Sequence, residues 1–315
     1  MKKLALAMSL AAGTLMVAAP AFPQNENEGR GQAVVTVLPA HDEAPAASLS
    51  AQDLHIKVNG KDSTITNWMP LRGENDRLEI VILMDAGARS SLGNQLDDIG
   101  NFVKTLPPQA KVSIAWMVNG MAQLSTPLTT DHQQALKGLH LPAGPIGVSA
   151  SPYFSLSSLA ERWPSDDRSA RRVVVMITDG VDYYNPRFDP EDPYMQKAIT
   201  DSVRSGLVVY SMYWQNRGRF DRSMWGTDAG QNLLNMVTQA TGGYSYWQGF
   251  GNPVSFQPYF KDLDRRLQNQ YEVAFTAPLK GKSGDVENLK LKVNAPSGKV
   301  DAPQQVFVAR STAGM

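Results

Sequence analysis

Four short, almost entirely apolar segments constrain the fold of this 315-residue chain more than any other feature of its sequence. They read Leu78-Glu-Ile-Val-Ile-Leu-Met84, Val112-Ser-Ile-Ala-Trp-Met-Val118, Val173-Val-Val-Met-Ile177 and Leu207-Val-Val-Tyr-Ser-Met212. Such strands are covered on both faces, as in parallel sheets flanked by helices. Apolar residues at helical spacing lie between them, for example at Leu96, Ile99 and Val103. We therefore expect an α/β fold with a doubly wound, mostly parallel sheet.

Segments near both ends of the chain instead alternate apolar and polar residues. Early segments span residues 33–38, 53–58 and 63–66, and late ones span residues 270–275, 289–293 and 305–308. Asn59-Gly60 between two early segments is a strong hairpin signal. Alternation predicts strands with one wet face, so we expect these segments to pair into a small β-sandwich annex.

The N-terminus has the three-part pattern of a secretory signal. Lys2 and Lys3 precede an apolar run over residues 4–19, and Ala19-Pro20-Ala21 supplies small residues for cleavage after Ala21. The alternative is a retained membrane anchor. No later segment is apolar for long enough to span a bilayer, so we expect no membrane insertion of the mature chain. The predicted location is the periplasm or the extracellular space.

Composition narrows the class of partner. The sequence has no cysteine, so neither disulfides nor thiolate metal sites are available. Lysine plus arginine and aspartate plus glutamate each number 30, a balance that argues against a nucleic-acid binder. The predicted organisation is a signal peptide over 1–21, a linker and β annex over 22–75, a main domain over 76–268, and strands that join the annex over 269–315.

Several phrases together resemble one family. They are Leu49-Ser-Ala-Gln-Asp-Leu-His-Ile-Lys-Val-Asn-Gly60, Val81-Ile-Leu-Met-Asp85, Val175-Met-Ile-Thr-Asp-Gly180 and Leu267-Gln-Asn-Gln-Tyr-Glu-Val273. In their order and spacing the chain resembles secreted bacterial proteins with a von Willebrand factor type A (VWFA) domain. The resemblance implies a Rossmann-like main domain that binds a protein partner. It also implies a metal-ion-dependent adhesion site, built from Asp-x-Ser-x-Ser, a threonine and a second aspartate.

This sequence departs from the family's metal site. Asp85 keeps the first aspartate, but Gly87 and Arg89 occupy the two serine positions. An arginine carries a fixed positive charge and cannot ligate a metal ion. If Arg89 points inward, it takes the role of the cation beside the aspartates, and the pocket works without metal.

The remaining site positions are equally incomplete. Ser149 or Ser151 could supply a hydroxyl in the threonine loop, and Asp179 keeps the second aspartate. We expect a degenerate, metal-free site and no cofactor. The alternative is a Mg²⁺-dependent adhesin with a rearranged site, in which Arg89 faces solvent, Ser90 or Ser91 shifts into place, and Asp85 and Asp179 are the ligands.

Two long segments rich in aromatic residues and arginine follow the predicted strands, over residues 182–194 and 213–225. Residues of these types dominate binding hot spots. The candidates for partner binding are Tyr183, Tyr184, Trp214, Arg217, Arg219 and Trp225. The alternative is that the aromatic side chains pack the loops onto the domain.

Catalysis is the less favoured interpretation. The sequence lacks a Gly-x-Ser-x-Gly elbow, a three-glycine dinucleotide turn and a histidine on a predicted carboxyl-end loop. We name no catalytic residue and expect an exported, non-enzymatic protein-binding or assembly module. An extracytoplasmic hydrolase is the other alternative.

Overall fold

The computed structural model describes residues 28–39, 49–143, 151–185, 189–215, 224–279, 284–294 and 298–310. Within these ranges the side chains of residues 89, 90 and 224 are not described. The predicted signal peptide over 1–21 and the side chain of Arg89 therefore lie outside the described part. Among the helices that the structure describes, none has both the length and the apolar character needed to cross a bilayer.

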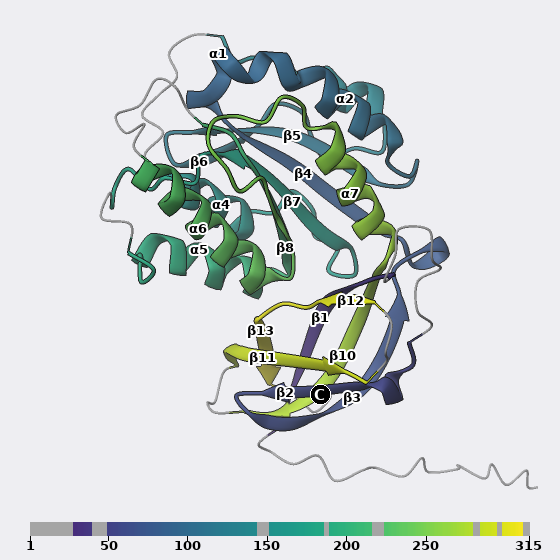
Figure 1. Cartoon of the computed structure of the whole chain (residues 1–315). Helices are drawn as coiled ribbons and strands as arrows, with labels where there is room; N and C mark the ends of the chain where they lie inside the picture. The colour runs from purple at the N-terminus through teal and green to yellow at the C-terminus, as the bar shows by residue number, and fades with distance from the viewer. Residues whose placement is uncertain are drawn as a thin grey trace, which may run out of the picture.

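Six strands from the two ends of the described chain form a closed antiparallel barrel, the lower body in Figure 1. Around the barrel the order is β1, β10, β3, β2, β11 and β13, and β13 pairs again with β1. β12 extends this sheet beside the end of β1. The bounds are β1 Glu28–Leu38, β2 Leu54–Val58, β3 Lys61–Pro70, β10 Gln270–Pro278, β11 Asp285–Val293, β12 Lys299–Asp301 and β13 Gln305–Arg310.

The predicted hairpin is confirmed within this barrel. β2 and β3 pair across Asn59 and Gly60, whose φ angles of 49° and 78° suit a tight two-residue turn. Inward-facing apolar side chains such as Val35, Val273 and Phe275 fill the barrel's core. The alternation read from the sequence is thus the alternation between a dry interior and a wet exterior.

The second body is a six-stranded mixed sheet with the order β6-β5-β4-β7-β8-β9. Strands β5, β4, β7, β8 and β9 pair in parallel, whereas the edge strand β6 is antiparallel to β5. The bounds are β4 Leu78–Asp85, β5 Lys111–Val118, β6 Met121–Leu124, β7 Arg171–Thr178, β8 Leu207–Tyr213 and β9 Ser245–Tyr246. Sequence reasoning missed β6, although Asn119-Gly120 before it is another tight-turn signal, with φ angles of 50° and 70°.

Helices cover both faces of the mixed sheet (Figure 1). One core packs α2, α3 and α7 against the sheet, and a second core packs α4, α5 and α6 against the opposite face. Alternate residues of β4 enter alternate cores, which is why this strand is apolar throughout. The helices are α1 Arg89–Leu92, α2 Leu96–Thr105, α3 His132–Leu136, α4 Pro152–Glu161, α5 Pro193–Arg204, α6 Met224–Thr241 and α7 Gln257–Gln268, with single 3-10 turns at Ala51–Asp53, Gly73–Asn75, Ala86–Ala88 and Gly93–Gln95.

The fold class predicted from the sequence is wrong. We expected a doubly wound, mostly parallel sheet of Rossmann-like type with a small β-sandwich annex, whereas the chain combines a mixed sheet with a closed six-stranded antiparallel barrel. A sandwich leaves strand edges open, but here Gly29, Arg30 and Gly31 of β1 pair with β13 while the other edge of β1 pairs with β10. Closure satisfies the backbone groups that an open edge would expose. Alternating polarity is common to both arrangements and could not distinguish them.

Buried arginines connect the two bodies. The guanidinium of Arg266 in α7 donates hydrogen bonds to Asp262 at 2.6 Å and to Asp301 of β12 at 2.7 Å. Arg171 at the start of β7 donates to Asp76 and to the side chain of Gln270 in β10, each at 2.6 Å. Burial alone would lower the pKa of Arg266, but its hydrogen bonds to the two carboxylates raise the pKa above its ordinary value. Arg266 therefore remains charged inside the junction, whereas burial lowers the pKa of Arg171 against the opposing charge of Asp76.

Candidate functional site

The candidate site lies at the carboxyl ends of β4, β7 and β8. Asp85 ends β4, Asp179 directly follows β7, and Trp214 directly follows β8. The carboxyl ends of parallel strands share one edge of a sheet, and open α/β sheets bind ligands there. The structure therefore brings the two predicted aspartates to the same edge.

Asp85 is buried, at 2% exposure, and its carboxylate accepts hydrogen bonds from its own surroundings. Oδ1 accepts the backbone N–H of Gly87 at 2.7 Å, and Oδ2 accepts the hydroxyl of Thr178 at 3.3 Å. The first of these contacts closes the turn after β4, and the second links that turn to the end of β7. Gly87 thus contributes a backbone donor to Asp85 where the family pattern has a serine oxygen.

Asp179 is held in a comparable way. Its Oδ1 accepts the backbone N–H of Val181 at 3.1 Å, and its Oδ2 accepts the phenol of Tyr183 at 3.0 Å. Tyr183, a predicted partner-binding residue, therefore bonds the site's own carboxylate. Its hydroxyl orders the loop after β7 in the described conformation.

Two further buried carboxylates lie close to this edge, and sequence reasoning missed both. Asp182 is fully buried, and one of its oxygens accepts the backbone N–H of Tyr184 at 2.8 Å. Asp192 caps α5 by accepting the N–H groups of Tyr194 and Met195. The signal for Asp192 was available, because an aspartate before Pro193 is a typical helix start. No comparable signal marked Asp182.

These acids shift the pKa values around them. Burial raises the pKa of Asp182, against the hydrogen bond from Tyr184, and the charge of Asp192 raises it further. Burial, followed by the charges of Asp182, Asp179 and Asp192, also raises the pKa of Tyr153 well above 10.0. Tyr153 therefore stays protonated and donates to the carbonyl oxygen of Gly180 at 2.7 Å.

Ser151 lies beside this group but acts as a helix cap in the described structure. Its hydroxyl oxygen accepts the N–H of Tyr153 at 3.2 Å at the start of α4, and Pro152 is the first helical residue. A serine N-cap followed by proline at the first helical position is a typical helix start. Ser149, Arg217 and Arg219 lie outside the described residues.

Asp85 and Asp179 are the two carboxylates that the resemblance offers as magnesium ligands at this edge. Mg²⁺ demands near-octahedral oxygen coordination. Among the described side chains, no group of three or more histidine, aspartate or glutamate residues could hold a metal ion. Each oxygen of Asp85 and Asp179 accepts a hydrogen bond from a nearby donor. The metal-free site stays a prediction.

The candidate aromatic residues divide into buried and exposed members. Trp214 is 4% exposed, donates its indole N–H to the hydroxyl of Ser91 at 2.9 Å, and meets Phe256 edge to face. Tyr184 is 60% exposed and Trp225, at the start of α6, is 57% exposed. Trp214 therefore packs the core in the described structure, whereas Tyr184 and Trp225 present aromatic surface to solvent.

Tyr184 belongs to a small aromatic cluster. Its ring lies 5.1 Å from that of Phe154 and 6.2 Å from that of Tyr194, and the latter two rings are 4.7 Å apart. The cluster joins the loop after β7 to α4 and α5. Part of Tyr184 thus anchors its loop, which agrees with the packing alternative, while its exposed part remains available for contact.

Close backbone packing positions α6 against this edge. A Cβ on Gly230 would lie 2.1 Å from the carbonyl oxygen of Asp179, and a Cβ on Gly180 would lie 2.4 Å from the carbonyl oxygen of Gly230. Only glycine permits such an approach at both positions. The start of α6, with Trp225, is thereby held close to Asp179.

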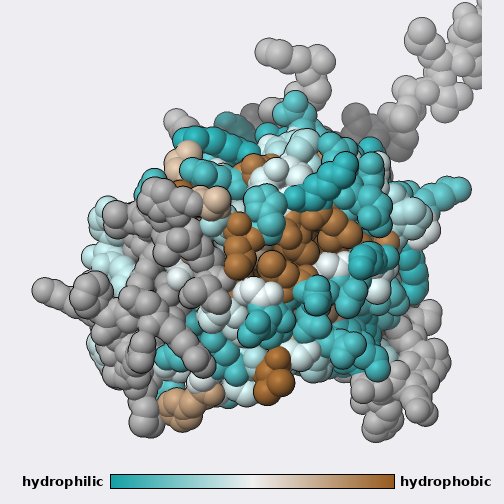
Figure 2. Space-filling model, turned by 90° about the horizontal axis from the view of Figure 1, so that it is seen from above, coloured by the Kyte–Doolittle hydropathy of each residue, from teal (hydrophilic) through white to brown (hydrophobic). Residues whose placement is uncertain are grey.

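A second apolar surface was not anticipated from the sequence. Figure 2 shows apolar side chains gathered on the face seen from above, the side of α1 and α2 in Figure 1. After α3, Leu141 is 37% exposed and lies 3.4 Å from the Cβ position of Gly93. Leu136 and Leu139 pack beside Gly100 of α2. Their helical and loop positions gave no periodic signal in the sequence.

Comparisons with known proteins find only distant structural similarity. No family model matches the sequence, and no curated protein matches it. An aerotolerance-related membrane protein from Bacteroides fragilis shares 16% identity over 60% of this chain and 98% of its own, with a TM-score of 0.44. BatB from Bacteroides thetaiotaomicron shares 15% identity over 60% of this chain and 97% of its own, with a TM-score of 0.42. The SpRpn10 VWA domain shares 12% identity over 59% of this chain and 94% of its own, with a TM-score of 0.40.

The structures similar to this chain thus include a VWA domain and a BatB protein. At these identities and TM-scores the similarity carries no argument about function. The candidate site therefore rests on its own geometry.

Proposed function

We propose that this chain is an exported, non-enzymatic protein-binding module whose contact surface is the carboxyl-end edge of the mixed sheet. One observation carries the proposal. Tyr184 and Trp225 expose 60% and 57% of their surface on segments that follow β7 and β8. Large aromatic side chains on a rigid scaffold are the residues that most often anchor protein contacts.

The rigidity of the scaffold supports this choice of surface. Hydrogen bonds from Tyr183 to Asp179 and from Thr178 to Asp85 order the loops beneath the exposed rings. A binding surface that is already ordered loses less conformational entropy when a partner binds. The edge therefore suits recognition of a folded partner.

Metal independence is part of the proposal. Glycine and arginine stand at positions 87 and 89, where the family pattern has oxygen ligands. The carboxylates of Asp85 and Asp179 already accept hydrogen bonds within the chain. A partner that bridged a magnesium ion would need at least one more oxygen ligand from this chain.

Export rests on the N-terminal pattern. A lysine pair, an apolar run over residues 4–19 and small residues before position 22 are typical of a cleaved signal. Expressing the full chain in its source and sequencing the N-terminus of the exported protein tests this directly. A mature chain that begins at Phe22 is the expected result, and a chain that retains Met1 in the membrane fraction contradicts it.

The proposed surface is tested by crosslinking capture from the native envelope, followed by purification of the captured protein and measurement of its Kd. The variant Tyr184→Ala/Trp225→Ala is compared with Leu124→Ala, which truncates an exposed apolar side chain on β6. We expect the double variant to bind at least tenfold more weakly, because hot-spot truncations cost about 2 kcal/mol or more. The Leu124→Ala variant should bind as the unaltered protein does.

Thermal unfolding of the same variants separates binding from packing. We expect the double variant to keep its melting temperature, because both side chains are more than half exposed. A lower melting temperature together with unchanged affinity would assign Tyr184 to the packing of Phe154 and Tyr194, and would refute the proposed surface.

A further inference from the structure

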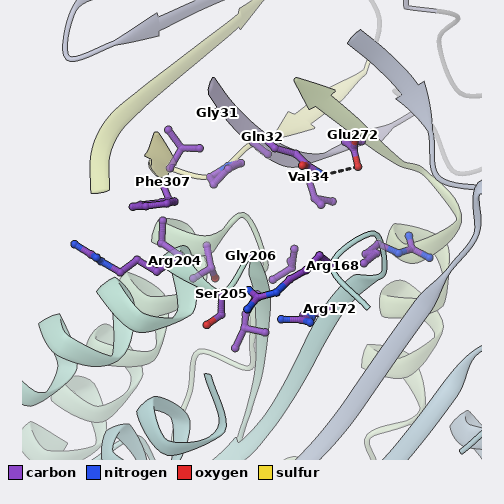
Figure 3. Close-up of a pocket in the computed structure, with 18 of the residues that line it drawn as sticks. Gly31, Gln32, Val34, Arg168, Arg172, Arg204, Ser205, Gly206, Glu272 and Phe307 are labelled. Carbon is purple, nitrogen blue, oxygen red and sulfur yellow. Dashed lines mark hydrogen bonds between the residues drawn. The ribbon is translucent and has the colours of Figure 1, made fainter. Parts of the chain in front are cut away.

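A cleft of about 400 Å³ separates the barrel from the mixed sheet, at the end of the sheet opposite the candidate site. Figure 3 shows residues of β1, β10 and β13 above the cleft, and residues at the starts of β7 and β8 and the end of α5 below it. This volume falls within the range of small-molecule sites. The cleft is therefore a second candidate site, distinct from the aromatic edge.

The charge of the cleft is strongly asymmetric. Its lining contains one carboxylate, that of Glu272, and five guanidinium groups, those of Arg30, Arg168, Arg171, Arg172 and Arg204. Two of the five are compensated, because Arg171 pairs with Asp76 at 2.6 Å and Arg204 pairs with Asp285 at 3.3 Å. The structure gives no ion pair to the other three within the described part of the chain.

Arg172 gives the clearest indication that the cleft binds an acceptor. Its side chain is buried, at 5% exposure, and its Nη2 donates to the backbone carbonyls of Ser165 and Asp167 at 2.9 and 3.2 Å. Its Nε–H is buried without an acceptor. A buried donor without a partner carries a free-energy penalty that a bound acceptor would remove.

Arg168 places a second positive charge beside Arg172. In Figure 3 the two guanidinium groups lie close together at the floor of the cleft. Burial lowers the pKa of Arg172 and the charge of Arg168 lowers it further, whereas the carboxylates of Glu79, Asp167 and Asp166 oppose this shift without reversing it. Repulsion of this kind is relieved when an anion binds between the two groups.

The walls around these charges are partly apolar. Val34 and Val306 contribute from the barrel, Phe307 lies beside them, and Val203 and Leu207 contribute from below. An inorganic anion would contact the arginines and leave these side chains unmatched. A ligand with an apolar body and one anionic group would match both features.

We propose that this cleft binds an organic anion, with its anionic oxygens at Arg168 and Arg172 and its apolar body against Val34 and Phe307. The anionic group is a carboxylate or a phosphate monoester, because guanidinium groups bind either through paired N–H donors. The proposal does not depend on the protein-binding surface, since it uses other residues at the opposite end of the sheet.

Calorimetric titration of the mature chain tests the proposal with four probes. They are 4-phenylbutyrate, its neutral amide 4-phenylbutyramide, phenyl phosphate and inorganic phosphate. We expect at least one of the two aryl anions to bind, the amide to bind at least tenfold more weakly than its acid, and inorganic phosphate to bind more weakly than phenyl phosphate. The tighter aryl anion identifies the anionic group.

Two variants locate the binding. Arg168→Gln removes an exposed, unpaired guanidinium and should weaken the binding of the aryl anion about tenfold or more, because a hydrogen bond to a charged group is lost. Arg162→Gln is the matched control, since Arg162 is exposed near α4 but does not line the cleft. Glu272→Gln removes the cleft's carboxylate and should tighten binding, because it removes repulsion from the anion.

Several outcomes would overturn the proposal. They are failure of both aryl anions to bind, equal binding of the amide and the acid, binding of inorganic phosphate as tight as that of phenyl phosphate, and equal affinities of Arg168→Gln and Arg162→Gln. Melting curves of each variant show that a loss of binding is not a loss of folding. Arg168 is exposed, so we expect its variant to have the same melting temperature as the unaltered protein.

Discussion

Gly230 offers the most direct test of how α6 is positioned at the candidate site. In an ordinary helix interior, Gly→Ala stabilises by about 1 kcal/mol. In α6, however, the added Cβ would lie 2.1 Å from the carbonyl oxygen of Asp179 and 3.2 Å from a methyl carbon of Val181. The oxygen belongs to backbone that cannot rotate away, so the helix or the loop must move.

The net effect follows from the difference of two terms. Overpacking of this kind costs about 1–3 kcal/mol, and a backbone contact this short belongs at the upper end of that range. Subtracting the gain in helix propensity leaves a loss of about 2 kcal/mol in the free energy of unfolding. For a chain of this size the melting temperature of Gly230→Ala should fall by about 3 °C.

Gly100→Ala in α2 is the matched control. There the nearest atoms to the added Cβ are the ends of the Leu139 and Leu136 side chains, at 3.4 and 3.7 Å, which can adjust. This variant should be stabilised by about 0.5–1 kcal/mol. Urea and thermal unfolding of both variants provide the measurement. If Gly230→Ala is as stable as Gly100→Ala, the close contact between α6 and Asp179 is refuted.

Three other predictions concern charge. Burial raises the pKa of Asp182 above its unfolded-state value of 3.8. The cost of ionising it in the folded state is therefore absent below the unfolded-state pKa, grows as pH rises from there, and is complete above the folded-state pKa. Relative to the unaltered protein, Asp182→Asn should gain urea stability between pH 4 and pH 7, and a parallel pH dependence of the two proteins would contradict this. Arg266→Gln removes the buried guanidinium that bonds carboxylates in α7 and β12, and should lower the free energy of unfolding by about 2–4 kcal/mol. Arg265→Gln is the control: it removes a more exposed ion pair and should cost less than about 1 kcal/mol. Equal losses for the two variants would argue against a stabilising role of the buried ion pairs of Arg266. Calorimetric titration with Mg²⁺ or Mn²⁺ should show no tight binding that Asp85→Asn abolishes, and such binding would favour the rearranged metal site.

Part of the candidate site could be predicted from the sequence, because strand ends are readable there. Apolar runs that stop at Asp85 and Thr178 locate the two aspartates at one edge of a parallel sheet. The different exposures of Tyr184 and Trp214 could not be predicted from the sequence. Both are aromatic residues in long segments, and only the tertiary contacts of Trp214 with Ser91 and Phe256 bury its ring.

The sequence by itself determined the local structure of this protein. The buried strands, the turn at Asn59-Gly60 and the helix start at Ser151-Pro152 each depend on residues a few positions apart, whose side-chain periodicity and backbone preferences act locally. Closure of the barrel depends on the pairing of β1 with β13, and the basic cleft depends on the fold bringing Arg30 and Arg168, which are far apart in the sequence, to the same cavity. Alternating polarity allows a sandwich as readily as a barrel, so only the tertiary structure decided which strand edges meet and which charges share a cavity.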